Sequence, residues 1–191
     1  MYIQHPSADA IELPLIALDD AAGNDGQLVE AARLGNRAAF SQLYARYSQM
    51  VNAIALAHAK PSETADVVQE AFTRALSKLS RLRDVRAFGG WLAIIARNCA
   101  RDRSRVSPVA EPNPLTPTLS QEERGSAAEA EEALEAVRAL PDAYRETLLM
   151  RLVEGLTGPE IAARTGLTEG SVRVNLHRGM KMLRERLRSK P

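Results

Sequence analysis

The sequence predicts an all-α protein of two small helical domains joined by a flexible, proline-rich linker. Apolar residues recur at three- and four-residue spacing through most of the chain, and no stretch alternates as a strand does. Four prolines fall between residues 108 and 117, which is typical of an extended connector. Residues 157–188 have the pattern of a helix-turn-helix. The expected divisions are an acidic arm at 1–25, a first domain at 26–105, the linker at 106–126 and a second domain at 127–191.

The arm at 1–25 contains five acidic residues and no lysine or arginine, together with Pro6 and Pro14. This composition predicts a largely disordered segment. Its acidic character would let it lie on a basic surface of the same chain, whereas a dispensable tail is the simpler interpretation.

The first domain is expected to consist of helices throughout. A short helix that begins near Gln27 should end at Gly35, and a longer one should end at the Lys60-Pro61 pair. Ser62 is expected to cap the third helix. The polar segment 81–86 should be a loop, and a last helix is expected over about residues 87–105.

Cations and aromatic residues meet where that last helix begins. Arg81, Arg83 and Arg86 come just before Phe88 and Trp91. Such a combination can hold a single nucleic-acid strand by phosphate pairing and base stacking. The alternative is that both aromatic residues belong to the core, which is the more common place for a lone tryptophan at helical spacing.

The second domain is expected to open with a helix at 127–139, which is rich in alanine and glutamate. Pro141 suits the first turn of the next helix, and Gly155 should end that helix. Thr157 and Glu160 have the spacing of a capping box for a third helix.

A turn then separates the third helix from a fourth. Gly166 suits the left-handed conformation that a tight turn needs, and Thr168 can cap the fourth helix. One face of the fourth helix is apolar, and Gly179 on that side would allow close packing. The opposite face carries mainly short polar groups and cations, namely Ser171, His177, Arg178 and Lys181, together with Val174, and Arg173 flanks it.

This division of faces is typical of a helix that enters the major groove of DNA, where arginine can grip guanine with two hydrogen bonds. An ordinary amphipathic surface helix would show a similar pattern. Charge supports the first interpretation. The net charge of +1 conceals local sums of about −5, +7, −5 and +4 over residues 1–25, 26–105, 106–140 and 141–191.

Several classes of protein are disfavoured. The scattered glycines form no phosphate-binding loop, the three histidines lack metal-ligand spacing, and no nucleophile–base grouping is evident. We therefore expect a protein that is not an enzyme and has no cofactor, metal, catalytic residue or small-molecule substrate. The single cysteine, Cys99, excludes an internal disulfide and favours a reducing cytoplasm. No apolar run is long enough to cross a membrane, and no signal peptide is evident.

Asp66 and Glu70 share one face of the third helix of the first domain, with Gln69 beside them. Paired carboxylates can perform acid–base chemistry, but an acidic face that docks on a basic partner explains them more simply.

Three segments together resemble a known family. The stretch from Leu140 to Leu187, the DVVQEAF segment and the segment from Ala87 to Asp102 are similar, in order and spacing, to motifs of the ECF (extracytoplasmic function) sigma factors of bacterial RNA polymerase. The resemblance covers about residues 26–188. It implies that Asp66, Gln69 and Glu70 dock on core RNA polymerase, and that the two domains recognise the −10 and −35 elements of promoter DNA.

By this resemblance, the −35 element would be read by Arg173, Val174, His177 and Arg178, with Ser171 and Lys181 on the same face. The −10 element would be bound by Arg83, Arg86, Phe88, Trp91, Asn98 and Arg101. The family further implies a partner anti-sigma factor. Many relatives carry serine and arginine at positions 174 and 175, where this chain has Val174 and Asn175, so the promoter sequence does not transfer.

The Gly89-Gly90 pair is also unusual inside a helix, and it predicts a later start for the −10 helix. Two other functions remain open: a helix-turn-helix regulator that does not bind polymerase, and a sigma mimic that titrates an anti-sigma factor.

Overall fold

A computed structural model describes residues 25–106 and 121–189 of the 191-residue chain. Within these residues all regular structure is helical, and the predicted all-α class is confirmed. The helices are α1 (Asp25–Arg33), α2 (Arg37–His58), α3 (Thr64–Lys78), α4 (Phe88–Val106), α5 (Gln121–Arg138), α6 (Asp142–Leu152), α7 (Gly158–Thr165) and α8 (Glu169–Arg188). Short 3-10 turns lie at Pro61–Glu63, Leu79–Arg81 and Val85–Ala87.

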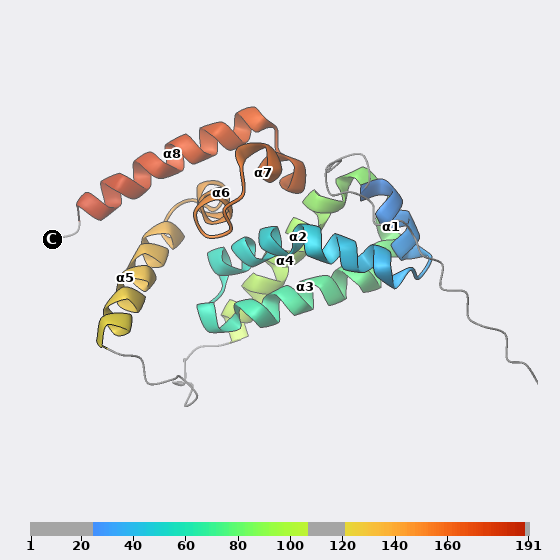
Figure 1. The fold of residues 1–191 in the computed structure, drawn as a ribbon, viewed down its shortest axis with the longest axis horizontal. Coiled ribbons are helices and arrows are strands. Elements are labelled where there is room, and N and C mark those ends of the chain that lie inside the picture. Colours follow the sequence, from blue (N-terminus) through green and yellow to red (C-terminus); the bar gives the residue numbers. More distant parts are fainter. Residues whose placement is uncertain (1–24, 107–120, 190–191) are drawn as a thin grey trace, which may run out of the picture.

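The first domain is a bundle of α2, α3 and α4, with α1 packed across α2 (Figure 1). Its core is built from small and aliphatic residues, including Leu43, Met50, Ile54 and Leu92, all inaccessible to solvent. Asp25 starts α1 in a nearly buried position, where its carboxylate accepts hydrogen bonds from Tyr47 and Arg46. The burial of Tyr47, together with its hydrogen bond to Asp25, raises the pKa of the phenol.

The second domain contains the predicted helix-turn-helix in α7 and α8. Thr157 and Glu160 form the capping box, Gly166 ends α7 with a φ of 75°, and Thr168 accepts a hydrogen bond from the amide of Ser171. Gly179 lets α8 lie directly on α6, because a Cβ atom there would come within 3.0 Å of Leu148.

The two domains pack against each other. α6 packs against α2, α7 contacts both α2 and α4, and the buried apolar residues of both domains form one continuous cluster. In Figure 1, α6 and α7 lie between the α2–α4 bundle and α8. The two helical domains that the sequence predicts are therefore present, and within the described residues they are packed against each other.

The C-terminal end of α2 is capped by arginines from the second domain. Arg138 donates hydrogen bonds to the carbonyls of Leu56 (2.9 Å) and Ala59 (2.6 Å), and Arg145 donates to the carbonyl of Ala57 (2.9 Å). Cations at this end of a helix also suit its dipole. The cap of one domain is therefore supplied by the other.

Three local expectations are corrected. Ser62 does not cap α3, because the 3-10 turn Pro61–Glu63 precedes the helix and its N-cap, Glu63, makes no side-chain cap bond. α5 begins at Gln121, ahead of the expected residue 127. The Gly89-Gly90 pair does not delay α4, which already begins at Phe88.

The reason for Gly89 is the close approach of α7. A Cβ atom at position 89 would lie 2.1 Å from the carbonyl oxygen of Arg164, so only glycine fits there. Gly90 is less constrained, because its Cβ would lie 3.5 Å from the Thr165 oxygen, at ordinary contact distance.

Much of the expected linker, and nearly all of the expected acidic arm, lie outside the described residues. Among the helices that are described, none combines the length and apolar character needed to span a bilayer.

Candidate promoter-DNA and polymerase interfaces

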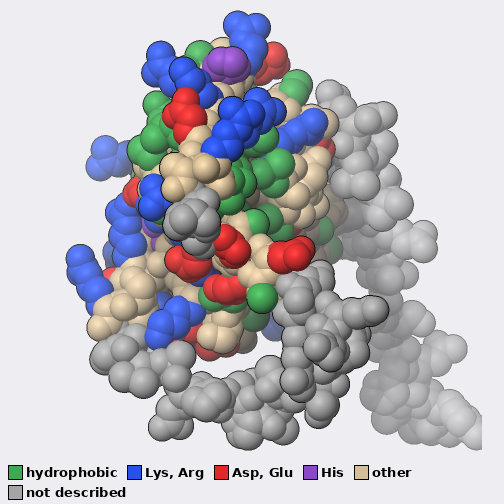
Figure 2. All heavy atoms as spheres, turned by 90° about the vertical axis from the view of Figure 1, so that its left-hand side faces the viewer, with side chains coloured by type: hydrophobic (Ala, Val, Ile, Leu, Met, Phe, Trp, Pro, Cys, Tyr) green, Lys and Arg blue, Asp and Glu red, His purple; other side chains and the backbone are tan. Residues whose placement is uncertain are grey.

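The outer face of α8 presents all six residues that the sequence analysis placed on it. Each is solvent-exposed: Ser171, Arg173, Val174, His177, Arg178 and Lys181. The opposite face anchors the helix through Val172, which is fully buried, and Leu183, which is 8% exposed. Figure 2, in which the left-hand side of Figure 1 faces the viewer, shows several lysine and arginine side chains at the top of the molecule, where α8 lies, with more acidic side chains lower down.

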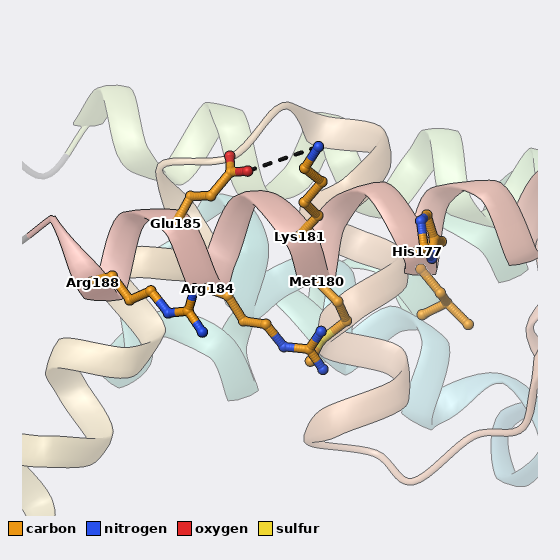
Figure 3. A pocket seen from close by; sticks show the side chains of 7 residues that line it. His177, Met180, Lys181, Arg184, Glu185 and Arg188 are labelled. Carbon is orange, nitrogen blue, oxygen red and sulfur yellow. Dashed lines mark ion pairs between the residues drawn. The ribbon is translucent and has the colours of Figure 1, made fainter.

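The basic face continues toward the C-terminal end of α8. Arg184 and Arg188 extend from the helix beside a groove that also contains Leu176 and Met180 (Figure 3). Lys181 makes only a long, exposed ion pair with Glu185, at 3.9 Å, so its ammonium remains available to an anionic ligand.

The loop that precedes α4 is held by α1. Arg33 donates hydrogen bonds to the carbonyls of Leu79 (3.1 Å) and Leu82, and these bonds fix the segment that carries Arg83 and Arg86. Both of the latter side chains are exposed. The Arg86 backbone amide donates to Asp84 at 3.0 Å, and this bond, with a second from the Arg86 side chain, lowers the pKa of Asp84.

Phe88 does not lie on the surface. Its side chain is fully buried between Tyr47 and Trp91, with ring centroids 5.1 Å and 6.0 Å away, so direct base stacking by Phe88 is not supported in this arrangement. Trp91 is half-buried, whereas Asn98 is exposed on the same helix. Arg101 is half-exposed and donates a 2.8 Å hydrogen bond to Asp142 of the second domain.

The acidic face of α3 is paired within the chain. Asp66 accepts a hydrogen bond from Arg103 at 3.0 Å, and Glu70 accepts one from Arg74 at 2.6 Å. Arg74 also reaches Asp102 at 3.2 Å, and the bonds from Glu70 and Asp102 raise the pKa of Arg74. Gln69 is exposed beside them. All three predicted docking residues thus share one accessible side of α3, with α4 cations at its edge.

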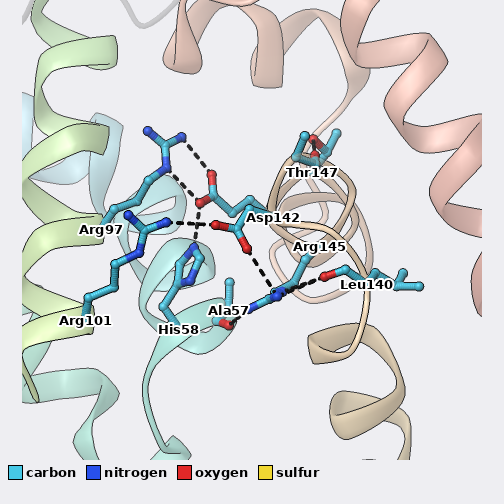
Figure 4. A network of polar contacts seen from close by, with 10 residues as sticks. Ala57, His58, Arg97, Arg101, Leu140, Asp142, Arg145 and Thr147 are labelled. Carbon is cyan, nitrogen blue, oxygen red and sulfur yellow. Dashed lines mark hydrogen bonds and ion pairs between the residues drawn. The ribbon is translucent and has the colours of Figure 1, made fainter. Parts of the chain in front are cut away.

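A buried polar cluster lies between the domains and was not predicted from the sequence. Glu146 of α6 is 5% exposed, and its carboxylate accepts hydrogen bonds from Arg97 at 2.8 and 2.7 Å. His58 of α2 lies 2.7 Å from the same carboxylate (Figure 4). A signal was available, because Glu146 is the only acidic residue between Ala143 and Val153, a segment otherwise rich in apolar residues.

Opposing effects act on Glu146. Burial pushes the pKa of this carboxyl up, but the hydrogen bonds and charges of His58 and Arg97 outweigh burial and hold its pKa below the usual value. The hydrogen bonds from Arg97 to Glu146 in turn raise the pKa of the guanidinium, against the effect of its own burial. The cluster is therefore an ionised carboxylate held by donors from two helices of the other domain.

Comparisons with known proteins agree with this arrangement. Residues 43–107 match the family model "Sigma-70 region 2", and residues 130–183 match "Sigma-70, region 4". A probable RNA polymerase sigma factor RfaY of Xanthomonas campestris pv. campestris is 32% identical over 173 residues, which cover 82% of this chain. The ECF RNA polymerase sigma-E factor of Escherichia coli (strain K12) is 28% identical over 181 residues, which cover 83% of this chain.

The chain spans 42% of the length of the RfaY relative and 92% of the sigma-E factor. A solved structure of CnrH in complex with the cytosolic domain of CnrY has a TM-score of 0.60 and 26% identity, covering 90% of this chain and 100% of that one. A helix-turn-helix domain packed on a second, all-helical domain that matches sigma region 2 defines a sigma-type transcription initiation factor. The chain belongs to the ECF family of RNA polymerase sigma factors.

Proposed function

We propose that this chain binds core RNA polymerase and directs promoter-specific initiation of transcription. In this proposal residues 26–105 dock on polymerase and bind the −10 element, residues 106–126 connect the domains, and residues 127–191 read the −35 element. The observation that carries the proposal is the outer face of α8, where all six candidate side chains are exposed on a helix anchored through its opposite face.

For the −35 element, α8 enters the major groove with its N-terminal half. Arg173 and Arg178 are the candidates for bidentate bonds to guanine, and the exposed Val174 is suited to contact a thymine methyl group. Ser171, His177 and Lys181 complete the contact with polar groups to bases and phosphates. Mutation of an arginine that reads a base should relax specificity at that position, whereas loss of Lys181 should weaken all sequences equally.

For the −10 element, the loop and α4 act together. Arg83 and Arg86 meet backbone phosphates, and the half-buried Trp91 offers a ring edge for a base. Asn98 and Arg101 lie further along α4. Phe88 packs against Trp91 from the core, and in this proposal it makes no direct contact with DNA.

Asp66, Gln69 and Glu70 form the docking surface for core polymerase. Because Asp66 and Glu70 are already paired with arginines at exposed positions, a basic partner can replace those weak pairs at little cost. The chain acts in the cytoplasm, without cofactor or catalytic residue, and is not an enzyme. Because CnrH forms a complex with the cytosolic domain of CnrY, we include an anti-sigma factor among the proposed partners.

The test is transcription in vitro with core polymerase and a pooled promoter library. Wild-type chain should select a defined set of promoters. Arg178→Ala should abolish that selection while polymerase binding persists, and the control Arg186→Ala, also exposed on α8, should retain it. Absence of promoter-selective transcripts with the wild-type chain would refute the proposal.

The same variants separate the two alternative functions. A regulator that does not use polymerase would bind duplex DNA yet fail to bind core enzyme, and the charge reversals Asp66→Lys and Glu70→Lys would change nothing. A sigma mimic would bind its anti-sigma factor but would be indifferent to Arg178→Ala. The control for charge reversal is Glu30→Lys, an exposed acid on α1.

A further inference from the structure

A groove along α8 combines apolar and cationic side chains. It begins beside Pro159, where α7 meets α8, and continues toward the end of α8. Leu176 lines both halves of the groove and Met180 follows one turn later, and both side chains are only partly buried. The cations that line it are Arg173, Lys181, Arg184 and Arg188. In Figure 3, Arg184 and Arg188 lie below the helix with Met180, and Lys181 lies above it.

The apolar part of this groove has no role in the proposed reading of the −35 element. DNA presents phosphates, sugars and polar base edges, and the methyl group of thymine is its main apolar feature in the major groove. The accessible parts of Leu176 and Met180 therefore suit a different ligand. Apolar side chains bounded by cations fit a peptide that carries apolar and acidic residues together.

The groove also has a surplus of positive charge. Its four cations stand against two acids, Glu169 and Glu185, which leaves a formal charge of +2. Among the residues that the structure describes, Arg173, Arg184 and Arg188 make no ion pair. These guanidinium groups are therefore available to an acidic ligand.

Residues 1–24 of the same chain have the complementary composition. They contain no lysine or arginine and four acids, namely Asp9, Glu12, Asp19 and Asp20. Segment 11–18 reads IELPLIAL, with Glu12 as its only charged residue. Pro14 favours an extended backbone before it, and in an extended chain Ile11, Leu13 and Leu15 share one side.

The arm joins the described body close to the groove. Asp25, which follows the arm, lines a hollow together with Glu160 of α7. Glu160 directly follows Pro159, which lines the start of the groove. The chain from Leu18 to Asp25 spans up to about 24 Å when extended. Because α7 is only about 12 Å long, segment 11–18 can reach the near end of the groove.

The two partners also match in length. Ten extended residues span about 33 Å, and the 20 residues of α8 span about 30 Å. A short flexible tether gives an effective concentration of the order of millimolar, so a contact with a dissociation constant of about 1 mM would be formed about half of the time.

We propose that segment 11–18 of the N-terminal arm lies in the α8 groove of the same chain and competes with DNA for this helix. Its apolar side chains pack on Leu176 and Met180, and the acids on either side of the segment pair with the groove arginines. The competition with DNA rests on the proposed function, whereas the contact itself does not.

Methionine methyl groups report on the groove directly in the full chain. Met180 lines the groove and Met182 lies on the same helix, whereas Met50 and Met150 are buried in the core and serve as internal references. Carbon-13 labelling of these methyl groups gives each an NMR signal that depends on its surroundings.

A matched pair of variants changes the arm without touching the folded body. Leu15→Ser with Ile16→Ser removes two apolar side chains from segment 11–18 and leaves the charge unchanged. Tyr2→Ser with Ile3→Ser removes two apolar side chains outside the segment and is the control.

The first pair should shift the Met180 signal and leave the signals of Met50 and Met150 in place. It should also tighten binding of the chain to a labelled duplex of random sequence by about twofold or more, as measured by fluorescence anisotropy. The control should match wild type in both measurements. An unchanged Met180 signal would overturn the proposal, and a shift with unchanged affinity for DNA would overturn the competition.

A second pair tests the contribution of charge. Asp19→Asn with Asp20→Asn should shift Met180 and tighten binding, whereas Glu30→Gln with Glu129→Gln, which removes two exposed acids elsewhere, should leave the Met180 signal unchanged.

The same spectra identify any other occupant of the groove. A Met180 signal that moves with protein concentration in wild type and arm variant alike would assign the groove to a second copy of the chain. A signal that moves only when duplex is added would assign it to DNA. Either result would overturn the proposal. The spectra of the free chain need neither promoter nor polymerase, so failure to bind core enzyme would count against the proposed function and not against this contact.

Discussion

The pair between Glu146 and Arg97 makes a quantitative prediction about stability. Arg97 donates two short bonds to Glu146, whose side chain is 7% exposed, while the Arg97 side chain is 32% exposed. Hydrogen bonds to charged groups contribute about 1.5–3 kcal/mol each. Because water reaches one side of Arg97, we expect about 2 kcal/mol of coupling between the two residues, within the range for contacting pairs.

The assay is a double-mutant cycle with Glu146→Ala, Arg97→Ala and the double variant. Each single change should lower the free energy of unfolding by about 3 kcal/mol, since it leaves a charged or polar partner in a buried site. The double variant should lose about 2 kcal/mol less than the two single losses together. Urea unfolding followed by circular dichroism provides the values, with an unchanged denaturant slope as the control. Strictly additive losses would refute the view that these two side chains form one unit.

Three further predictions concern single sites. Because the pKa of Glu146 is lowered in the folded chain, the contribution of its carboxylate to the free energy of unfolding is complete above about pH 4.3, the usual pKa of glutamate, and is lost as pH falls through the lower folded pKa. The difference in the free energy of unfolding between wild type and Glu146→Gln should therefore be constant from about pH 5 to about pH 7 and should shrink below about pH 4. Gly179→Ala brings a Cβ to 3.0 Å from the buried Leu148 and should lower the free energy of unfolding by about 1 kcal/mol, despite the gain in helix propensity. Gly170→Ala, whose Cβ would have its nearest neighbour, the Thr168 hydroxyl, at 3.9 Å, should not lower it. Cys99 is buried, and burial raises the pKa of its thiol. A thiol reagent at about pH 8 should therefore modify Cys99 only as fast as the first domain opens. Equally fast labelling of the native and the urea-unfolded chain would contradict this prediction.

Local signals in the sequence predicted the local structure well. The capping box of Thr157 and Glu160 and the left-handed Gly166 are present, because each depends on residues within one or two turns. The close packing at Gly179 is also present, because helical periodicity places this residue on the apolar face of α8 that meets α6. The exposed face of α8 followed from helical periodicity alone.

Contacts between distant segments could not be predicted in this way. Nothing in the pattern around Gly89 indicated that Arg164, 75 positions later, would lie against it, and the pair was misinterpreted as a late helix start. Phe88 was assigned to DNA because a ring after a basic loop suits a base, but the register of α4 turns it into the core. The pairs Arg103–Asp66 and Arg74–Asp102 likewise depend on how α3 and α4 cross, whereas the pair Arg74–Glu70 lies within α3 at a spacing of four residues.

The arginine caps on α2 tie domain separation to local order. Any separation of the domains would deprive the carbonyls of Leu56, Ala57 and Ala59 of the guanidinium groups of Arg138 and Arg145, and these carbonyls would then have to bond to water. The last turn of α2 should then fray, and its amides should exchange hydrogen faster. Opening of the chain would thereby be visible in a secondary structure element far from any promoter contact.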